Sequence, residues 1–112
     1  GVDLSVVEEL ERMGLVVGHQ AGSATVFDDD ALLVAKLASR FLVLGFDIRH
    51  LRMYLVAAQR EAGVFEQVLL PRLRDDQKTR AAVQGQLDEL TEAGSRLREI
   101  MLRRSLGKLG RP

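Results

Sequence analysis

The sequence has 112 residues and no cysteine, and its 16 basic side chains are balanced by 16 acidic ones, which gives a formal net charge of zero. This length predicts one domain with a modest core, and the lack of cysteine excludes disulfides, thiolate catalysis and zinc–cysteine sites. The balanced charge argues against a general basic surface for nucleic acid or anionic lipid. No apolar run reaches the roughly 20 residues that cross a bilayer, and no signal peptide is visible, so we expect a soluble cytoplasmic domain without a membrane partner.

The first predicted element is a helix over about residues 4–13. Its apolar stripe consists of Leu4, Val7 and Leu10. Asp3 is a good N-cap, and Ser5 with Glu8 has the alternative spacing of a capping box. Gly14 fits the left-handed position that ends a helix.

A small hairpin is predicted next, with strands at residues 15–17 and 24–27. Both segments are apolar and partly β-branched, and Gly18 and Gly22 lie in the turn between them. Because two strands alone are only marginally stable, we expect this hairpin to pack against a helix.

The second predicted helix runs from Asp28 to Leu44. The residues Asp28 to Asp30 stand at its start, where carboxylates cap free N–H groups and meet the positive end of the helix dipole. Its apolar residues are Leu32, Leu33, Val34, Leu37, Phe41, Leu42 and Leu44. Because they surround most of the helix, we expect it at the centre of a bundle or at a packed interface. The core predicted around the wing consists of Phe27, Leu37, Phe41 and Leu51.

Two further helices complete the predicted fold. Asp47 caps the third helix, and Pro71 must kink it or break it near Leu70 because proline lacks the N–H that a helix interior needs. The last helix covers residues 75–106, and residues 107–112 form a tail that is expected to fray. This last helix carries a heptad-like seam if Gly94 is accepted as a small member. The seam consists of Val83, Leu87, Leu90, Leu97 and Met101.

Short motifs stand at the joints between these elements. They are Gly14-Leu15, Phe27-Asp28, Gly45-Phe46, Ile48 and Leu51. In this order they resemble the MerR-type transcriptional regulators, over about half of the chain. The resemblance implies a mainly α fold with a degenerate MerR-like winged helix at residues 1–55 (helix, two-stranded wing, helices). A helix extension at residues 56–74 and the long C-terminal helix would follow within a single domain.

Two features depart from the MerR pattern. The first helix carries Glu8, Glu9 and Glu11, and the wing has only His19 as a potential cation, whereas affinity for DNA rests largely on basic contacts. The helix that would precede Leu4 and complete a helix-turn-helix is also missing. We therefore assign DNA reading to a domain absent from this chain, and we disfavour the alternative of a winged helix that binds DNA directly.

Later steps in the chain extend the resemblance. Arg60-Glu61, Glu66-Gln67 and Pro71 follow one another in a way similar to the C-terminal domain of FtsR-type MerR regulators, which are associated with control of cell-division genes. In that group a MerR-like DNA-binding domain precedes a degenerate winged helix. The resemblance implies a regulatory and dimerisation domain, and small-molecule effector sensing remains the alternative function.

Two candidate sites follow from this interpretation. We expect a homodimer that uses the seam from Val83 to Met101 together with part of the second helix. We place a possible effector pocket between the wing and the third helix, near Arg52 and Tyr54. Aromatic residues make up only 4% of the chain, which offers little of the lining that ligand pockets commonly have.

The remaining polar residues have simple structural explanations. His19 and His50 lack a second metal ligand nearby in the sequence, and capping explains Asp28 to Asp30 with fewer assumptions than a magnesium site does. Glu61 and Glu66 are five residues apart and do not face each other on a helix. We therefore expect no catalysis, no metal and no cofactor.

A basic group near the C-terminus is opposed by Glu99 alone. It consists of Arg96, Arg98, Arg103, Arg104, Lys108 and Arg111. Such charges stabilise a helix C-terminus and form a solvated face. We favour this explanation over a nucleic-acid-binding tail, because no aromatic residues are interleaved for base stacking.

Overall fold

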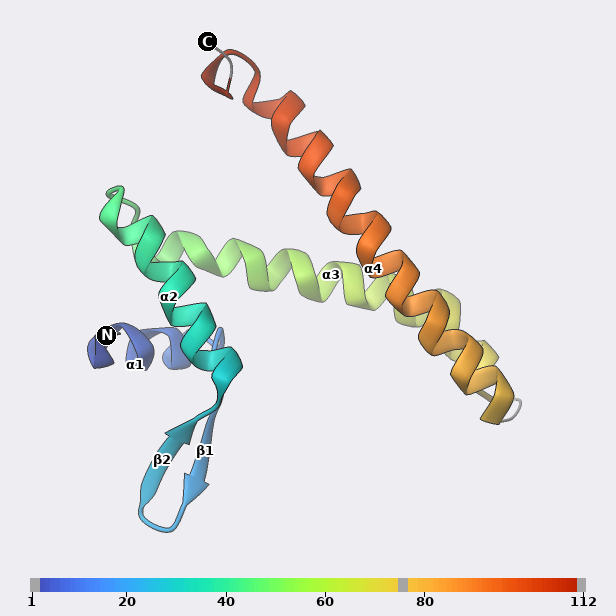
Figure 1. Cartoon of the computed structure of the whole chain (residues 1–112), viewed down its shortest axis with the longest axis horizontal. Helices are drawn as coiled ribbons and strands as arrows, with labels where there is room; N and C mark the ends of the chain where they lie inside the picture. The colour runs from blue at the N-terminus through green and yellow to red at the C-terminus, as the bar shows by residue number, and fades with distance from the viewer. Residues whose placement is uncertain (1–2, 75–76, 111–112) are drawn as a thin grey trace. The chain divides into compact units, whose positions relative to one another are not determined.

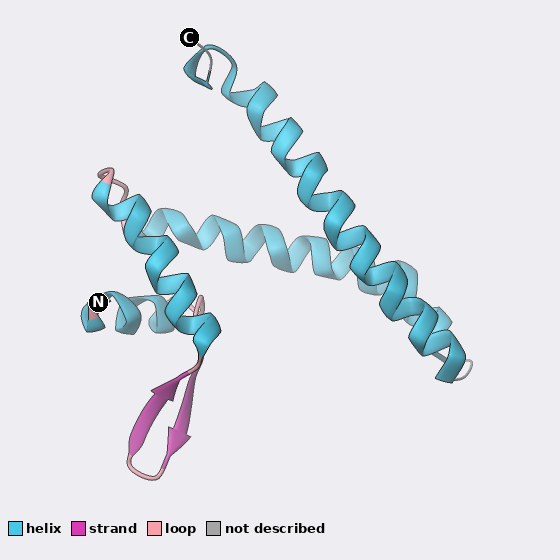
Figure 2. Cartoon of the chain, viewed as in Figure 1, coloured by secondary structure: helices cyan, strands magenta, loops and turns pink. Residues whose placement is uncertain are grey.

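The computed structural model describes residues 3–74 and 77–110. Its elements are α1 (Leu4–Arg12), β1 (Gly18–Ala21), β2 (Ala24–Phe27), α2 (Asp29–Val43), η1 (Ile48–Leu51), α3 (Arg52–Leu69), η2 (Leu70–Arg74), α4 (Gln77–Leu106) and η3 (Gly107–Gly110), the η elements being 3-10 helices. The predicted mainly α fold, with a two-stranded antiparallel sheet between helices and a long C-terminal helix, is confirmed (Figure 2). The chain divides into two compact units, an N-terminal unit of residues 1–61 and a C-terminal unit of residues 62–112, and the boundary falls inside α3.

Helix α1 has a defined cap at each end. The Asp3 side chain accepts the Ser5 N–H at 2.9 Å, so Asp3 is the N-cap. At the other end Gly14 has a φ of 83°, and the Leu15 N–H donates to the Leu10 carbonyl at 2.9 Å. This left-handed ending satisfies the last carbonyl groups of the helix. It also brings Leu15 back to the side of Leu10.

The hairpin differs from the prediction in its first strand. Strand β1 begins at Gly18 and not at residue 15, and it pairs antiparallel to β2 with Gly18 opposite Phe27. Gly22 has a φ of 64°, as tight two-residue turns require at their first central position. Val16 is buried in the core. Val16 therefore packs in the core and does not pair in the hairpin, because the gain from burial outweighs the β propensity of this segment.

Helix α2 ends with the same geometry as α1. Asp28 caps its start by accepting the Ala31 N–H at 2.8 Å. Gly45 has a φ of 93°, and the Phe46 N–H donates to the Phe41 carbonyl at 3.2 Å. The rings of Phe41 and Phe46 meet edge to face with centroids 5.7 Å apart. This is the hydrophobic contact that often accompanies such a helix end.

The core of the N-terminal unit lies between α1 and one face of α2 (Figure 1). Its buried residues are Val7, Leu10, Val16, Ala31, Ala35, Ala38 and Leu51. Helix α2 thus turns its alanines inward, while Leu33 and Leu37 are 54% and 44% exposed. Small side chains at a helix contact allow a close approach of the two helices, and the fully buried Leu10 fills the space that the alanines leave.

The predicted core is therefore correct only in part. Leu51 is buried, and Phe27 and Phe41 are half-buried and pack against the core. Leu37 is exposed, so its assignment to the core was wrong. The cause is that α2 is apolar on nearly all sides, so helical periodicity alone could not identify its inner face.

In the C-terminal unit η2 (Leu70–Arg74), which follows α3, packs against the first half of α4. Helix α3 ends at Leu69, and Pro71 lies in η2, in agreement with the predicted break. Leu69 and Val83 are buried, and the Arg72 Nη1 donates to the Gln86 Oε1 at 2.9 Å. Helix α4 has 30 residues and so extends about 45 Å. Along its second half no other described element of this unit runs beside it, up to η3 (Figure 1).

Helix α4 ends at Leu106, as the sequence predicts, and its start and the segment after it are as follows. The helix is described from Gln77, and the two residues before it, 75 and 76, lie outside the described residues. Residues 107–110 form the short η3 where the sequence predicts a frayed tail. Gly107 has a φ of 52°, a left-handed value that ends α4.

Candidate functional site

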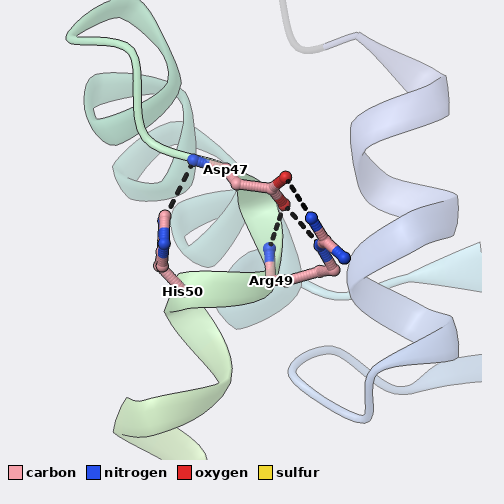
Figure 3. Close-up of polar contacts among 3 residues, drawn as sticks. All are labelled: Asp47, Arg49 and His50. Atoms are coloured by element: carbon pink, nitrogen blue, oxygen red, sulfur yellow. Dashed lines mark hydrogen bonds and ion pairs between the residues drawn. The ribbon is translucent and has the colours of Figure 1, made fainter.

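The Asp47 carboxylate organises the turn that leads into α3 (Figure 3). It accepts the Arg49 N–H at 2.8 Å, and the Arg49 guanidinium donates to its two oxygens at 3.1 and 3.0 Å. The His50 Nδ1 accepts the Asp47 N–H at 3.1 Å. The hydrogen bonds from the side chain and then the backbone of Arg49 lower the pKa of Asp47 to about 2. This network fixes η1, which places Leu51 in the core and Tyr54 one turn further along.

An apolar cavity of about 380 Å³ lies in the N-terminal unit. It is lined by Leu10, Leu15, Val34, Leu37, Ala38, Phe41, Leu51 and Tyr54. Its floor is buried, with Leu10 and Leu51 at 0% and 5% exposure, whereas Leu37 and Tyr54 are partly exposed and form its rim. The cavity is therefore an open depression above a packed interior.

Only one of the two residues predicted for an effector pocket lines this cavity. Tyr54 lines it and Arg52, which is exposed, does not. The lining comes from α1, α2, η1 and α3 and from Leu15 in the segment after α1, so the cavity lies among the helices and not beside the wing. Sequence reasoning missed the α2 residues because they read as core. The spacing of Val34, Leu37 and Phe41 by three and four residues was the signal that marked one shared face.

The few aromatic rings of the chain gather at one edge of the cavity. The rings of Phe41 and Tyr54 have centroids 5.8 Å apart and are tilted by 59°. Phe46 contacts Phe41, and the His50 ring lies edge-on to Phe46 at 6.0 Å. A low aromatic content therefore does not prevent an aromatic wall, because the helix end at Gly45 brings the rings together.

The predicted seam of α4 is divided between two environments. Val83 is buried at 7% exposure and Leu87 is half-buried, so these two residues take part in the packing of the unit itself. Leu90, Leu97 and Met101 are 38%, 59% and 46% exposed. Leu90 still borders Val68 and Leu69 at the end of α3, and Leu97 and Met101 lie beyond them along the helix.

We call the residues Leu90, Gly94, Leu97 and Met101 the outer seam. Their steps of four and three residues keep them on one face of α4. Ala93 and Ile100 lie beside this face and widen it. Sequence reasoning missed them because a strict heptad seam counts two positions per repeat, whereas a broader face counts three.

Comparison with known proteins gives one family assignment. Residues 1–110 match the family described as "Rv1828-like, C-terminal domain". The chain belongs to this family. Membership indicates a regulator-type domain. No curated protein matches the chain significantly, and no solved structure does so either.

The helix and wing of this Rv1828-like domain carry little positive charge. Glu8 is exposed on α1, and Arg12 forms an ion pair with Glu9. In the wing the His19 Nε2 lies 3.8 Å from an Asp28 carboxylate oxygen. The described residues contain no group of three or more His, Asp or Glu side chains placed to hold a metal ion. In the same part of the chain we find no helix with the length and apolarity needed to cross a membrane.

Proposed function

We propose that this Rv1828-like domain is the regulatory and dimerisation domain of a MerR-family transcription factor of the FtsR type. The succession of α1, hairpin and α2, with left-handed glycines at Gly14 and Gly45, supports a winged-helix origin. The family description, which names a C-terminal domain, supports a role beside a separate DNA-reading domain. The domain acts by binding and not by catalysis.

The outer seam is the observation that carries this proposal. Leu97 and Met101 expose about half of their surface along a face that the C-terminal unit leaves uncovered. Contiguous exposed apolar surface usually marks an interface. Gly94 weakens an isolated helix by about 1 kcal/mol relative to alanine, so the second half of α4 depends on packing for its stability. A second copy of the chain offers a face of the same length and spacing.

The spacing of the outer seam fits an antiparallel pair of α4 helices. In an antiparallel coiled coil an a position of one helix faces a d position of the other helix. Leu90 then meets Met101 of the second copy, and Gly94 meets Leu97 of the second copy. Gly94 leaves room for the large Leu97 side chain opposite it, so both facing pairs can pack without steric clash.

The charges of α4 favour the same orientation. Arg104 continues the seam three residues after Met101, so parallel helices would place the two Arg104 side chains face to face. In the antiparallel register Arg104 of one copy is instead level with Leu87 of the other. Like charges in opposition disfavour a pairing, so we assign the antiparallel arrangement.

Sedimentation equilibrium tests the proposal. We expect the wild type to have twice the 12.4 kDa monomer mass at tens of micromolar, roughly the range of a specific but modest complex. The double substitution Leu90→Asp with Leu97→Asp should give a folded monomer, because it places carboxylates within the seam.

The matched control is Leu102→Asp, which alters the same helix at a residue of similar exposure outside the seam. This variant should stay dimeric. A monomeric wild type would end the dimer proposal. An unfolded double variant would show that the outer seam belongs to the monomer fold, and the interface would then have to use another face.

A second candidate function is effector sensing, and the apolar cavity favours it. The cavity has a buried floor and an open rim in the unit that carries the winged-helix elements. Small-molecule sites are typically concave and mostly apolar with few polar groups. Direct binding of a small molecule to this chain, or its failure, separates this candidate from a purely dimerising domain.

A further inference from the structure

We propose that the cavity between α1, α2 and the start of α3 binds a small, uncharged ring compound with a single polar group placed beside Tyr54. This inference goes beyond dimerisation by assigning a ligand class to the cavity. Only the regulatory consequence of binding rests on the proposed function; the binding itself does not.

The size and depth of the cavity suit a compact ligand. Its volume of about 380 Å³ lies in the lower part of the range of about 300–1,000 Å³ found for ligand sites. Leu10, Ala38 and Leu51 form a floor with at most 5% exposure. Because these three residues have almost no accessible surface, a ligand would contact mainly Leu37, Tyr54 and the partly buried residues of the lining. Removal of that apolar surface from water is the main source of affinity for an apolar molecule.

The lining selects against charge. Of the eight lining residues Tyr54 alone has a polar side-chain group. The basic residues of α2, Lys36 and Arg40, are exposed and are not part of the lining. A buried charge without a partner is costly, and a single hydroxyl cannot compensate for it. A carboxylate or an ammonium group held against the apolar lining would therefore oppose binding, whereas one hydroxyl or carbonyl can pair with Tyr54.

The aromatic wall selects for a ring. Phe41 and Tyr54 stand 5.8 Å apart at a tilt of 59°, and aromatic groups gain from edge-to-face and offset contacts in this distance range. The Phe41 carbonyl also accepts the Phe46 N–H, and the Phe41 ring packs against the Phe46 ring at the end of α2. A ligand that touches Phe41 therefore touches the residue that closes α2 before η1.

The competing occupant is an apolar side chain from a second copy of the chain. The outer seam of α4 has helical spacing and would present a row of side chains, whereas the cavity has one buried floor and one opening. A second copy in the cavity would make ligand binding weaken as the protein concentration rises. A true ligand site keeps the same dissociation constant at every concentration at which the chain is folded.

The probe is 1-naphthol, and its anionic analogue 1-naphthoate is the matched control. Both are titrated into the isotopically labelled 112-residue chain and followed by NMR at two protein concentrations. We expect 1-naphthol to bind with a dissociation constant on the order of 10–100 μM, a reasonable affinity for a ligand with so few atoms. The shifts should concentrate on Val34, Leu37, Phe41 and Tyr54. Binding of 1-naphthoate should be at least about tenfold weaker, because the lining offers no cationic partner for a carboxylate held against it.

Two variants test the residues. Leu37→Trp fills the rim and should weaken 1-naphthol binding by about tenfold or more, because the larger side chain occupies the ligand volume. Leu33→Trp makes the same change on the exposed side of α2 and should leave binding unchanged. Tyr54→Phe should weaken 1-naphthol by roughly threefold to tenfold, the loss of one hydrogen bond, and leave naphthalene unaffected.

The proposal fails if saturating 1-naphthol shifts no cavity residue, if 1-naphthoate binds equally well, or if Leu33→Trp weakens binding as much as Leu37→Trp does. It also fails if the affinity falls as the chain is concentrated. If Leu37→Trp does not fold, the comparison of 1-naphthol with naphthalene on Tyr54→Phe still decides. A monomeric chain that binds 1-naphthol would refute the dimer and retain the cavity, and a dimer that binds nothing would do the reverse.

Discussion

The N-terminal unit and the second half of α4 both carry apolar residues at helical spacing, yet one face is closed and the other is open. In the N-terminal unit Leu10 and Ala35 are fully buried, whereas on α4 Leu97 is 59% exposed. Helical spacing therefore identifies an apolar face and does not identify its partner. The comparison also shows that small residues can form the inside of a helix contact while large ones remain outside, available for assembly.

The largest expected effect contrasts the two regions directly. Leu10→Ala should destabilise the chain by about 2–5 kcal/mol at every protein concentration, because it leaves a cavity in a packed core. Leu97→Ala should change the stability of the dilute monomer by less than about 0.5 kcal/mol. Chemical denaturation at two concentrations checks both. The contrast disappears if dilute Leu97→Ala is as destabilised as Leu10→Ala.

A smaller effect tests which face of α2 is buried, since its alanines are buried and its leucines are exposed. Ala35→Leu should cost about 1–3 kcal/mol, because the added side chain has no room against α1. Leu33→Ala on the opposite face should stay within about 0.5 kcal/mol of the wild type. Thermal or chemical denaturation of both variants is sufficient. A larger loss for Leu33→Ala than for Ala35→Leu would show that α2 faces the other way.

A local effect is expected at the Asp47 turn, as a function of pH. The pKa of Asp47 is lowered from its ordinary value of 3.8 to about 2 by the hydrogen bonds from Arg49. The ionised carboxylate therefore stabilises the folded state above the ordinary pKa, and this contribution is lost as the pH falls toward 2. Wild type and Asp47→Asn should differ in stability near neutral pH and converge in this acidic window. A difference at pH 2 as large as that near neutral pH would contradict the assignment.

The smallest expected effect is the absence of DNA binding by this chain. Its net charge is zero, and exposed Glu8 and Glu11 stand on α1, where they repel phosphates. Fluorescence anisotropy with duplex DNA at physiological salt should show no appreciable binding. Micromolar binding that weakens with added salt would move DNA reading into this chain.

The sequence predicted the helices better than it predicted their faces. Local chemistry fixes helix ends, so Asp28 and Gly14 could be assigned from residue type alone, whereas the sequence left Asp3 and Ser5 as alternative N-caps. Strand β1 was misplaced because burial of Val16 depends on contacts that local propensity does not contain. The inner face of α2 was missed because its apolar residues surround the helix.

The candidate sites were likewise predicted where they depend on local spacing and missed where they depend on tertiary contacts. The seam of α4 was visible as spacing, but the burial of Val83 could be seen only after folding. Tyr54 was identified for the pocket, whereas Leu10, Leu15 and Ala38 were not. Their place in the lining depends on how the left-handed helix ends bring α1, α2 and α3 together, and no single segment of the sequence encodes that meeting.

The most direct test of the central claim is disulfide mapping of the outer seam, since the chain has no cysteine of its own. Leu90→Cys and Met101→Cys are prepared separately, mixed under conditions of subunit exchange, and oxidised. The antiparallel pairing places these two positions opposite each other, within the Cβ separation of about 3.5–4.5 Å that a disulfide needs. We expect a covalent dimer on a non-reducing gel from the mixture and little from either variant alone. Efficient linking of each variant with itself would indicate parallel helices, and no linking in any combination would contradict pairing through α4.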